Sequence, residues 1–254
     1  MSGKLAVVGL GPGDARYLTR EALEALAEAD ALYGYGPYLD RIEAKPGQAR
    51  YPTDNREEGA RSCAALAQAA RGANVAIVSG GDPGVFAMAA SVCEEIASGP
   101  PDWRALEMRI VPGVTAMLAV ASRAGAPLGH DFCALSLSDN LKPWELIERR
   151  LAAAAEAGFV IALYNPVSQA RTWQLNHAFA LLGRHLPGTT PVIFGRAVGR
   201  AGEGLVVTTL ADAHNIAADM ATLIIIGSRE TRVVARDGQT PLVYTPRAVS
   251  SVPA

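Results

Sequence analysis

Short apolar runs alternate with amphipathic stretches along most of the chain. The apolar runs are β-strand candidates, with the sequences KLAVVGL, NVAIVSG, MRIVPG, FCALSLS, FVIALYN, TPVIFG, EGLVVTT and TLIIIGS. Stretches rich in Ala, Leu and Glu lie between several of them, at residues 20–29, 55–71, 85–97, 143–157 and 172–185. The alternation predicts an α/β protein with mainly parallel or mixed sheets.

Capping residues indicate where several of these helices begin and end. Thr19 and Asp54 are N-cap types placed just before two of them, and Pro143 suits the first position of a third. Gly72 and Gly158 follow two predicted helices, where a glycine commonly ends the last turn.

A Gly- and Pro-bearing segment, RAGAPLGHD at residues 123–131, interrupts the pattern near the midpoint of the chain. We expect it to connect an N-terminal α/β domain, residues 1–122, to a C-terminal α/β domain, residues 132–254. The tail, residues 243–254, is expected to be poorly ordered.

Composition excludes several classes of protein. The 254 residues are 50% hydrophobic and 19% charged, with a formal charge of −2, so no basic surplus indicates nucleic-acid binding. No apolar run reaches the roughly 18 residues that span a bilayer, and no signal peptide is visible, so we expect a cytoplasmic protein that binds no membrane. Three isolated cysteines and histidines without ligand spacing predict reduced thiols and no metal site.

A glycine cluster, VVGLGPGD at residues 7–14, follows the first strand candidate. Its spacing resembles a dinucleotide-binding turn, but Asp14 stands where the last glycine of G-x-G-x-x-G would lie. Pro12 also lacks a backbone N–H for a phosphate, and the next helix begins only after Thr19. A pyrophosphate-binding turn is therefore not favoured, and a purely structural glycine turn stays open.

Two further loops, SGGDPGVF at residues 79–86 and VPGVTA at residues 111–116, also follow strand candidates. Loops at the carboxyl ends of strands are where open α/β folds bind ligands, so three such loops suggest one shared ligand. None carries the Gly-Lys-Ser/Thr ending of a nucleotide triphosphate site. Asp82 and bare backbone amides suit a ligand with hydroxyl and amino-acid groups but no phosphates, such as S-adenosylmethionine.

Together with ALYNPVSQAR, TPVIFGRAVGR and TLIIIGS, in that order, these loops resemble the tetrapyrrole methylases, which use S-adenosylmethionine to methylate precorrins and uroporphyrinogen. SLSDNLKPWELIERRL and YNPVSQAR are most similar to the branch that methylates precorrin-3B at carbon 17 and contracts the ring to precorrin-4 in cobalamin biosynthesis. Other branches of the family have a Tyr-Met-Gly type sequence where this chain has YNP. The resemblance therefore implies that Asn165 lies at a cofactor-site position, but it implies no particular side-chain contact there. The resemblance implies two α/β domains with the cofactor between them, a substrate trough and a homodimer.

By matching position, the resemblance also implies which residues line the cofactor site, with S-adenosylhomocysteine as the product. They are Pro12, Gly80, Gly81, Asp82, Val85, Thr115, Ala116, Asn165, Val198 and Thr222. Pro12 is expected beside the reacting methyl group, and Asp82 near the ribose or methionine portion.

Substrate-binding candidates lie in the same motifs: Tyr35, Ser138, Arg171, Arg196 and Arg200. Arginine pairs bidentately with carboxylates such as the acetate and propionate groups of the substrate. Exposed loop arginines, and packing of Tyr35 at a domain edge, are the alternatives.

Ring contraction benefits from a general base that removes the proton of the carbon-20 hydroxyl. Asp139 is the first candidate and Asp14 the second, while a turn-forming role before Pro143 is the alternative for Asp139. Other functions also stay open: methylation of another precorrin, cobalt-precorrin-3B, uroporphyrinogen, a ribosomal RNA ribose or a protein residue, or a non-catalytic cofactor-binding module.

Overall fold

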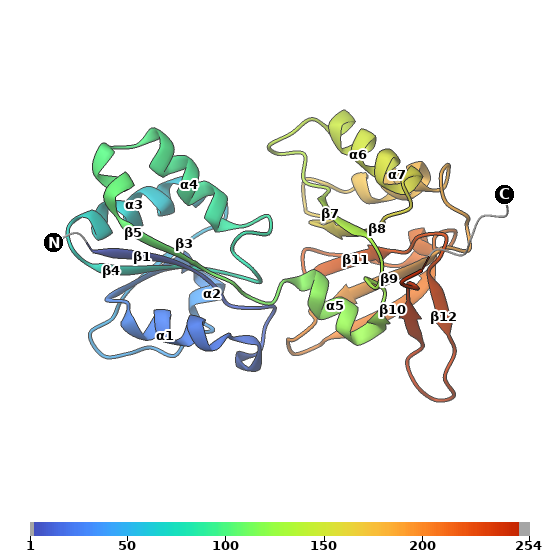
Figure 1. Cartoon of the computed structure of the whole chain (residues 1–254), viewed down its shortest axis with the longest axis horizontal. Coiled ribbons are helices and arrows are strands. Elements are labelled where there is room, and N and C mark those ends of the chain that lie inside the picture. The colour runs from blue at the N-terminus through green and yellow to red at the C-terminus, as the bar shows by residue number, and fades with distance from the viewer. Residues whose placement is uncertain (1–2, 249–254) are drawn as a thin grey trace. The chain divides into compact units, whose positions relative to one another are not determined.

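The computed structural model describes residues 3–248 of the chain (Figure 1). The chain divides into two compact units, Met1–Ala116 and Met117–Ala254. The segment expected to connect two domains, residues 123–131, begins at the end of α5 (Ala116–Ala124) and belongs to the second unit. The domain limits 1–122 and 132–254 stay predictions.

The first unit is built on one five-stranded parallel sheet with the strand order β3-β2-β4-β1-β5. Its strands are β1 (Lys4–Gly9), β2 (Ala31–Tyr35), β3 (Ala49–Thr53), β4 (Asn74–Ser79) and β5 (Glu107–Val111). Its helices are α1 (Arg20–Glu28), α2 (Gly36–Leu39), α3 (Glu58–Ala70) and α4 (Met88–Ser98), with 3-10 turns η1 (Ala15–Tyr17) and η2 (Pro101–Ala105). Because all five strands run the same way, their carboxyl ends share one edge of the sheet.

Alternate residues of the central strands fill the cores on the two faces of this sheet. Leu5 and Val7 of β1 pack with residues of α3 and α4, whereas Ala6 and Val8 pack with residues of α1 and α2. Side chains of a strand point alternately to its two faces, so helices on both sides make β1 apolar and buried from Leu5 onward. Figure 1 shows α1 below this sheet and α3 and α4 above it.

The second unit contains a five-stranded mixed sheet with the order β10-β9-β11-β8-β7. Its strands are β7 (Phe132–Ser136), β8 (Val160–Tyr164), β9 (Pro191–Arg196), β10 (Gly204–Thr209) and β11 (Thr222–Ile226). The pair β7–β8 is parallel and the other pairs are antiparallel. Helices α6 (Trp144–Glu156) and α7 (Gln174–Leu182) bury its main core. A 3-10 turn η3 (Ala213–Asn215) precedes β11.

The α/β prediction is confirmed, and each of the apolar runs forms a strand. Thr19 caps α1, since its Oγ1 accepts a hydrogen bond from the Ala22 N–H at 3.0 Å. Gly72 and Gly158, with φ of 103° and 82°, follow the ends of α3 and α6 as predicted.

Two predicted helix starts are wrong in detail. Asp54 does not cap α3, which begins at Glu58, because Arg56 has a φ of 70° that no helix accommodates. Pro143 is the N-cap of α6 rather than its first residue. The apolar pattern also failed to predict β3, whose Pro52 is tolerated because β3 is an edge strand.

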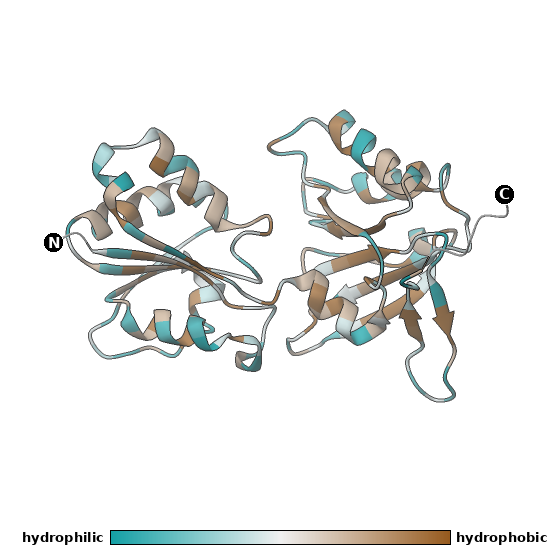
Figure 2. Cartoon of the chain, viewed as in Figure 1, coloured by the Kyte–Doolittle hydropathy of each residue, from teal (hydrophilic) through white to brown (hydrophobic). Residues whose placement is uncertain are grey.

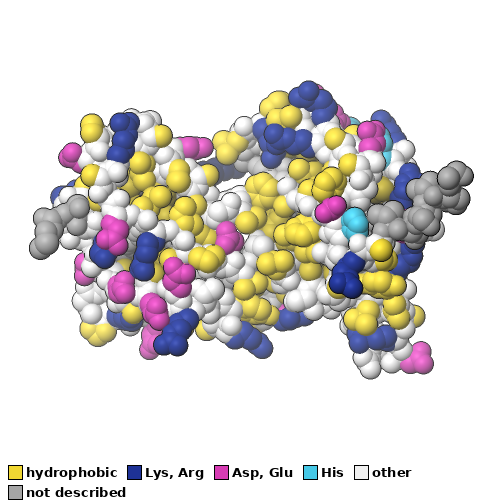
Figure 3. Space-filling view, in the orientation of Figure 1, with side chains coloured by type: hydrophobic (Ala, Val, Ile, Leu, Met, Phe, Trp, Pro, Cys, Tyr) yellow, Lys and Arg dark blue, Asp and Glu magenta, His cyan; other side chains and the backbone are white. Residues whose placement is uncertain are grey.

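A small sheet with the order β12-β13-β6 completes the second unit. Its strands are β6 (Gly125–Ala126), β12 (Arg232–Val234) and β13 (Leu242–Tyr244). The expected disorder of the tail is wrong for Val243, which is buried in β13; residues 249–254 lie outside the described part of the chain. The hairpin of β12 and β13 carries partly exposed hydrophobic residues: Val233, Val234, Leu242 and Tyr244. Figure 2 shows the hydrophobic colour along its strands, and Figure 3 shows hydrophobic side chains on its surface.

Candidate functional site

Three glycine loops of the first unit meet at the carboxyl edge of its sheet. We call them loop 1 (residues 10–14), loop 2 (residues 79–86) and loop 3 (residues 111–116); they lie at the ends of the adjacent strands β1, β4 and β5. Gly11 and Gly81 form an antiparallel bridge: the Gly11 N–H donates to the Gly81 carbonyl at 3.1 Å, and the Gly81 N–H donates to the Gly11 carbonyl at 2.9 Å. Loops 1 and 2 are therefore one hydrogen-bonded unit.

The carboxylate of Asp82 joins loop 2 to loop 3. Its Oδ1 accepts a hydrogen bond from the Gly84 N–H at 2.8 Å, and its Oδ2 accepts one from the Gly113 N–H at 3.0 Å. Gly113 of loop 3 lies against the backbone of loop 2, where a Cβ added to Gly113 would be 2.2 Å from the Gly81 carbonyl oxygen. Asp82 thus fixes the mutual position of two loops, and a carboxylate oxygen keeps further acceptor capacity for a ligand hydroxyl.

Arg41, which follows α2, binds loop 1 through the backbone carbonyls of the loop. Its Nη2 donates to the carbonyls of Leu10 at 2.7 Å, Gly11 at 3.1 Å and Gly13 at 2.8 Å, and its Nε donates to the Gly13 carbonyl at 3.1 Å. These contacts constrain the backbone on both sides of Pro12. Sequence reasoning missed Arg41, because it belongs to no motif and reaches back about 30 residues along the chain.

The remaining candidates of the first unit lie around this edge. Tyr35 ends β2, and its ring packs edge-on against Tyr38 with centroids 5.4 Å apart. The Tyr38 ring in turn covers Gly80, where a Cβ would lie 2.7 Å from its Cζ. Val85 lies in loop 2, and Thr115 is buried just before Ala116, the first residue of α5.

Asp14 caps η1 instead of standing free. Its Oδ1 accepts a hydrogen bond from the Arg16 N–H at 2.9 Å, and its Oδ2 accepts one from the Arg16 guanidinium at 3.2 Å. The backbone N–H of Arg16, followed by its guanidinium, lowers the pKa of the Asp14 carboxyl. This arrangement gives Asp14 a structural role and makes it the weaker of the two candidate bases.

In the second unit, Ser138, Asn165 and Arg171 form one network. Asn165, with a φ of 51°, donates from its Nδ2 to the Ser136 Oγ at 3.0 Å, and the same oxygen accepts from the Ser138 N–H at 3.2 Å. Arg171 donates from Nη1 to the Asn165 carbonyl at 2.8 Å and is only 6% exposed. Arg171 is therefore not an exposed loop arginine, and its role toward the substrate stays a prediction.

Asp139 lies in the loop after β7 and accepts a hydrogen bond at 3.0 Å, on Oδ2, from the Nε2 of Gln174. Gln174 is the first residue of α7 and is 3% exposed. No sequence signal pointed to Gln174, since glutamine at a helix start is common and its partner is 35 residues away.

The antiparallel pairing of β9 with β11 places Arg196 opposite Thr222. Val198 is buried in the turn after β9, where the Arg200 N–H donates to the Ala197 carbonyl at 2.9 Å. Arg196 Nε donates to Oδ2 of Asp219 at 2.8 Å, and the Thr222 hydroxyl donates to Oδ1 at 2.9 Å. Partial burial alone would raise the pKa of Asp219, but hydrogen bonds from Thr222, Arg196 and the Ala221 N–H together hold it below its ordinary value.

We expect Asp219→Asn to destabilise the chain near neutral pH but not in acid. The pKa of Asp219 is lower in the folded chain than its ordinary value of 3.8, so its stabilisation is present above that value and is lost as the pH falls through the folded pKa. Because the carboxylate is 44% exposed, we expect an effect of at most about 1 kcal/mol.

Urea unfolding of the wild type and of Asp219→Asn, measured from neutral to acidic pH, checks this expectation. The difference between their free energies of unfolding should close at the acidic end, and a difference that persists there would contradict it. Asp237→Asn, in an exposed turn, is the matched control and should leave stability unchanged at every pH.

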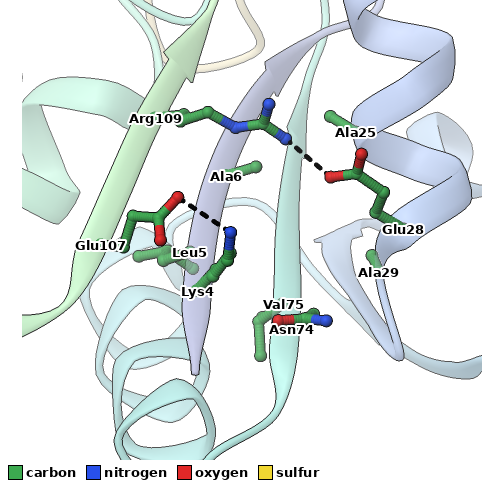
Figure 4. Close-up of a pocket in the computed structure, with 10 residues that line it drawn as sticks. All are labelled: Lys4, Leu5, Ala6, Ala25, Glu28, Ala29, Asn74, Val75, Glu107 and Arg109. Carbon is green, nitrogen blue, oxygen red and sulfur yellow. Dashed lines mark hydrogen bonds and ion pairs between the residues drawn. The ribbon is translucent and has the colours of Figure 1, made fainter. Parts of the chain in front are cut away.

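A shallow pocket of about 20 Å³ lies at the opposite edge of the first sheet (Figure 4). It is bordered by two ion pairs, Lys4 to Glu107 and Arg109 to Glu28, each 3.1 Å long. Lys4 is the first residue of β1, whereas loop 1 follows the last, so this pocket is unrelated to the loops. It has room for about one water molecule.

Within residues 3–248, no group of three or more His, Cys, Asp or Glu side chains is arranged to hold a metal ion. None of the helices described is both long and apolar enough to span a membrane.

Comparison with known proteins identifies the class to which this fold and these loops belong. Residues 4–214 match the family model of the tetrapyrrole (corrin/porphyrin) methylases, and the chain belongs to that family. It is 64% identical, over 247 residues and 97% of both chains, to a precorrin-3B C(17)-methyltransferase of Sinorhizobium sp.. It is 43% identical to a probable cobalt-factor III C(17)-methyltransferase of Salmonella typhimurium, over 96% of this chain and 98% of the other.

Solved structures give the same picture. The crystal structure of the methyltransferase CobJ matches with a TM-score of 0.92 and 46% identity, covering 96% of this chain and 100% of that one. A uroporphyrin-III C-methyltransferase from Thermus thermophilus, complexed with S-adenosylhomocysteine, matches with a TM-score of 0.67 and 23% identity over 89% of this chain and 97% of that one, which shows the shared fold.

Proposed function

We propose that this chain is an S-adenosylmethionine-dependent methyltransferase that methylates precorrin-3B at carbon 17 and contracts the ring to precorrin-4, a step of cobalamin biosynthesis. The observation that carries the proposal is its 64% identity to a precorrin-3B C(17)-methyltransferase over 97% of both chains. The interlocked glycine loops support it, since they lie at the carboxyl ends of adjacent parallel strands, where open α/β folds bind their ligands. We also propose that the enzyme is cytoplasmic and homodimeric, as family members usually are; sedimentation would measure its mass in solution.

The residues of loops 1, 2 and 3 fit S-adenosylmethionine by their chemistry. The loops themselves contain no lysine or arginine, which argues against a phosphate, whereas the oxygens of Asp82 keep acceptor capacity for a hydroxyl or ammonium group of the ligand. Gly81 has a φ of 66°, and a Cβ there would have no neighbour closer than 3.7 Å, so the backbone of loop 2 is open to a ligand at this point. We propose that the ten cofactor residues inferred from the sequence bind the cofactor.

When bound, S-adenosylmethionine supplies an electrophilic methyl group on a sulfonium. The chain contributes to this step by aligning the methyl donor with the substrate carbon. Proximity and orientation alone can lower an activation barrier by about 7–11 kcal/mol. Arg41 and the Gly11–Gly81 bridge hold the backbone around Pro12, which we place beside the donor. Tyr35, Ser138, Arg171, Arg196 and Arg200 are proposed to orient the substrate.

Ring contraction needs a general base, whereas methyl transfer needs mainly the alignment of donor and acceptor. We propose that Asp139 accepts the proton of the carbon-20 hydroxyl, whose oxygen becomes a carbonyl as a ring carbon–carbon bond shifts from carbon 20 to the neighbouring ring carbon. That carbon takes the bonding pair as its own bond to oxygen breaks, and carbon 20 leaves the ring as an acetyl group. Asp139 is a better candidate than Asp14, because both oxygens of Asp14 are engaged by Arg16.

The experiment that tests this function is incubation of the wild type and Asp139→Asn with S-adenosylmethionine and precorrin-3B, followed by mass spectrometry of the products. The wild type should give the methylated, contracted product, and the variant should give a methylated product that is not contracted. Contraction by the variant at the wild-type rate would remove Asp139 as the base, and a wild type that does not methylate precorrin-3B would refute the function.

A cobalt-containing substrate is the second candidate, favoured by the 43% identity to a protein named as a probable cobalt-factor III C(17)-methyltransferase. Comparing turnover of metal-free and cobalt-loaded substrate distinguishes the two. The higher identity to the precorrin-3B enzyme leads us to expect faster turnover of the metal-free form.

A further inference from the structure

We propose that Gln174 is a positioning residue for Asp139, holding one carboxylate oxygen so that the other is presented for proton transfer during ring contraction. This inference rests on the proposed function, in which Asp139 is the base. It arises from a contact that only the folded second unit creates, between the loop after β7 and the first residue of α7.

Hydrogen bonds at both the oxygen and the nitrogen of the Gln174 side-chain amide fix its orientation. Its Oε1 accepts a hydrogen bond from the Trp173 N–H at 3.2 Å, so its Nε2 must face Asp139 as a donor, at 3.0 Å from Oδ2. Because Gln174 is 3% exposed, the side chain has no room to turn away. Asp139 Oδ1 forms no hydrogen bond with any residue in the described part of the chain.

Trp173, the N-cap of α7, supplies no side-chain cap, and the next residue, Gln174, reaches the loop of Asp139 with its side chain. The Gln174 amide donates a hydrogen bond to the carboxylate and is not itself a base, so it leaves the proton-accepting role to Asp139.

Other charged groups lie on the loop of Asp139 and on the helices and loops next to it in the second unit. His177 of α7 lies 2.7 Å from Glu148 of α6 and packs edge-on against Trp173, with ring centroids 5.6 Å apart. Lys142 lies on the loop of Asp139, and Arg171 before α7 is bound to the Asn165 carbonyl. Among the residues that the structure describes, none forms an ion pair with Asp139, so the hydrogen bond from Gln174 is the contact to perturb.

Gln174→Glu provides the test, because it replaces the amide donor with a second carboxylate of the same shape. Two carboxylates in contact share a proton, which disfavours ionisation of the pair. On the acidic side of its pH profile, the contraction rate falls as the pH drops, and we expect the variant to shift this part of the profile to higher pH by about one unit. At a given pH in that range, contraction should be about tenfold slower than in the wild type. Methyl transfer in the same single-turnover reaction should stay unchanged.

Two further variants keep the test decisive. Asn176→Glu adds the same charge on the exposed side of the same helix and should leave both steps at wild-type rates. Gln174→Met removes the hydrogen bond without adding charge and should slow contraction at every pH without changing methyl transfer; it also serves if Gln174→Glu fails to fold.

The outcomes separate this inference from the function on which it rests. If Asp139→Asn blocks contraction but neither Gln174 variant alters its rate or pH dependence, the positioning role is overturned and the base remains. If Asp139→Asn contracts normally, both roles are overturned while methyl transfer stands. A pH shift that Asn176→Glu reproduces would also overturn the inference, because the effect would then be one of helix charge alone.

Discussion

Gly113→Ala is expected to separate the three glycine loops and to weaken cofactor binding severely. A Cβ at this position would lie 2.2 Å from the Gly81 carbonyl oxygen and 2.9 Å from the Gly9 carbonyl carbon, both backbone atoms that no side-chain rotation can move. The φ of Gly113 lies outside the left-handed region, so the obstacle is space and not backbone conformation. Overpacking of this kind costs about 1–3 kcal/mol.

Moving loop 3 away would also lengthen the hydrogen bond from the Gly113 N–H to Asp82. If restoring the loops for binding costs about 1.4–2.8 kcal/mol, the affinity for S-adenosylhomocysteine falls about 10- to 100-fold. Calorimetric titration and urea unfolding measure the two effects. Gly36→Ala is the matched control, because its Cβ would meet only Pro52, at 4.0 Å, and unchanged binding by Gly113→Ala would show that loop 3 is not part of the site.

Arg41→Met is expected to destabilise the first unit and to loosen loop 1. The substitution keeps much of the apolar stem but removes the hydrogen bonds to the carbonyls of Leu10, Gly11 and Gly13. A hydrogen bond to a charged group contributes about 1.5–3 kcal/mol, and three acceptors share this guanidinium, so we expect a loss of about 2–4 kcal/mol. Because loop 1 carries Pro12, binding of S-adenosylhomocysteine should weaken as well.

Arg41→Lys is the informative control. A lysine ammonium retains the charge but not the planar fork, so it should recover part of the stability and less of the affinity. Urea unfolding and calorimetry on the three proteins check this order. Equal behaviour of the wild type and Arg41→Met would show that the Gly11–Gly81 bridge alone shapes loop 1.

Local chemistry made part of the fold predictable. Apolar runs and helical spacing identified the principal strands and helices, and Thr19, Gly72 and Gly158 marked helix ends through interactions within a few residues. The weaker strands escaped notice, because an edge position or a small sheet needs no long apolar run.

The candidate site was predictable as a set of motifs but not as an arrangement. The order β4-β1-β5, which brings loops 1, 2 and 3 to one edge, depends on which strands pair, and no local pattern specifies that. Asp82 and Arg171 illustrate the same limit. The sequence predicts Asp82 as a ligand contact but not its hydrogen bond from the Gly113 N–H, and it leaves Arg171 either a substrate-binding or an exposed loop arginine, whereas in the fold Arg171 is buried.

The sequence by itself determined the α/β class, the family resemblance and the residues that carry the loops, since these follow from periodicity and from short motifs. Tertiary structure alone decided that Arg41 holds loop 1, that Asp82 joins loops 2 and 3, and that Gln174 orients Asp139. The physical reason is distance along the chain. Each of these hydrogen bonds links residues about 30 positions apart, and only the packing of strands and helices into sheets brings such residues within 3 Å.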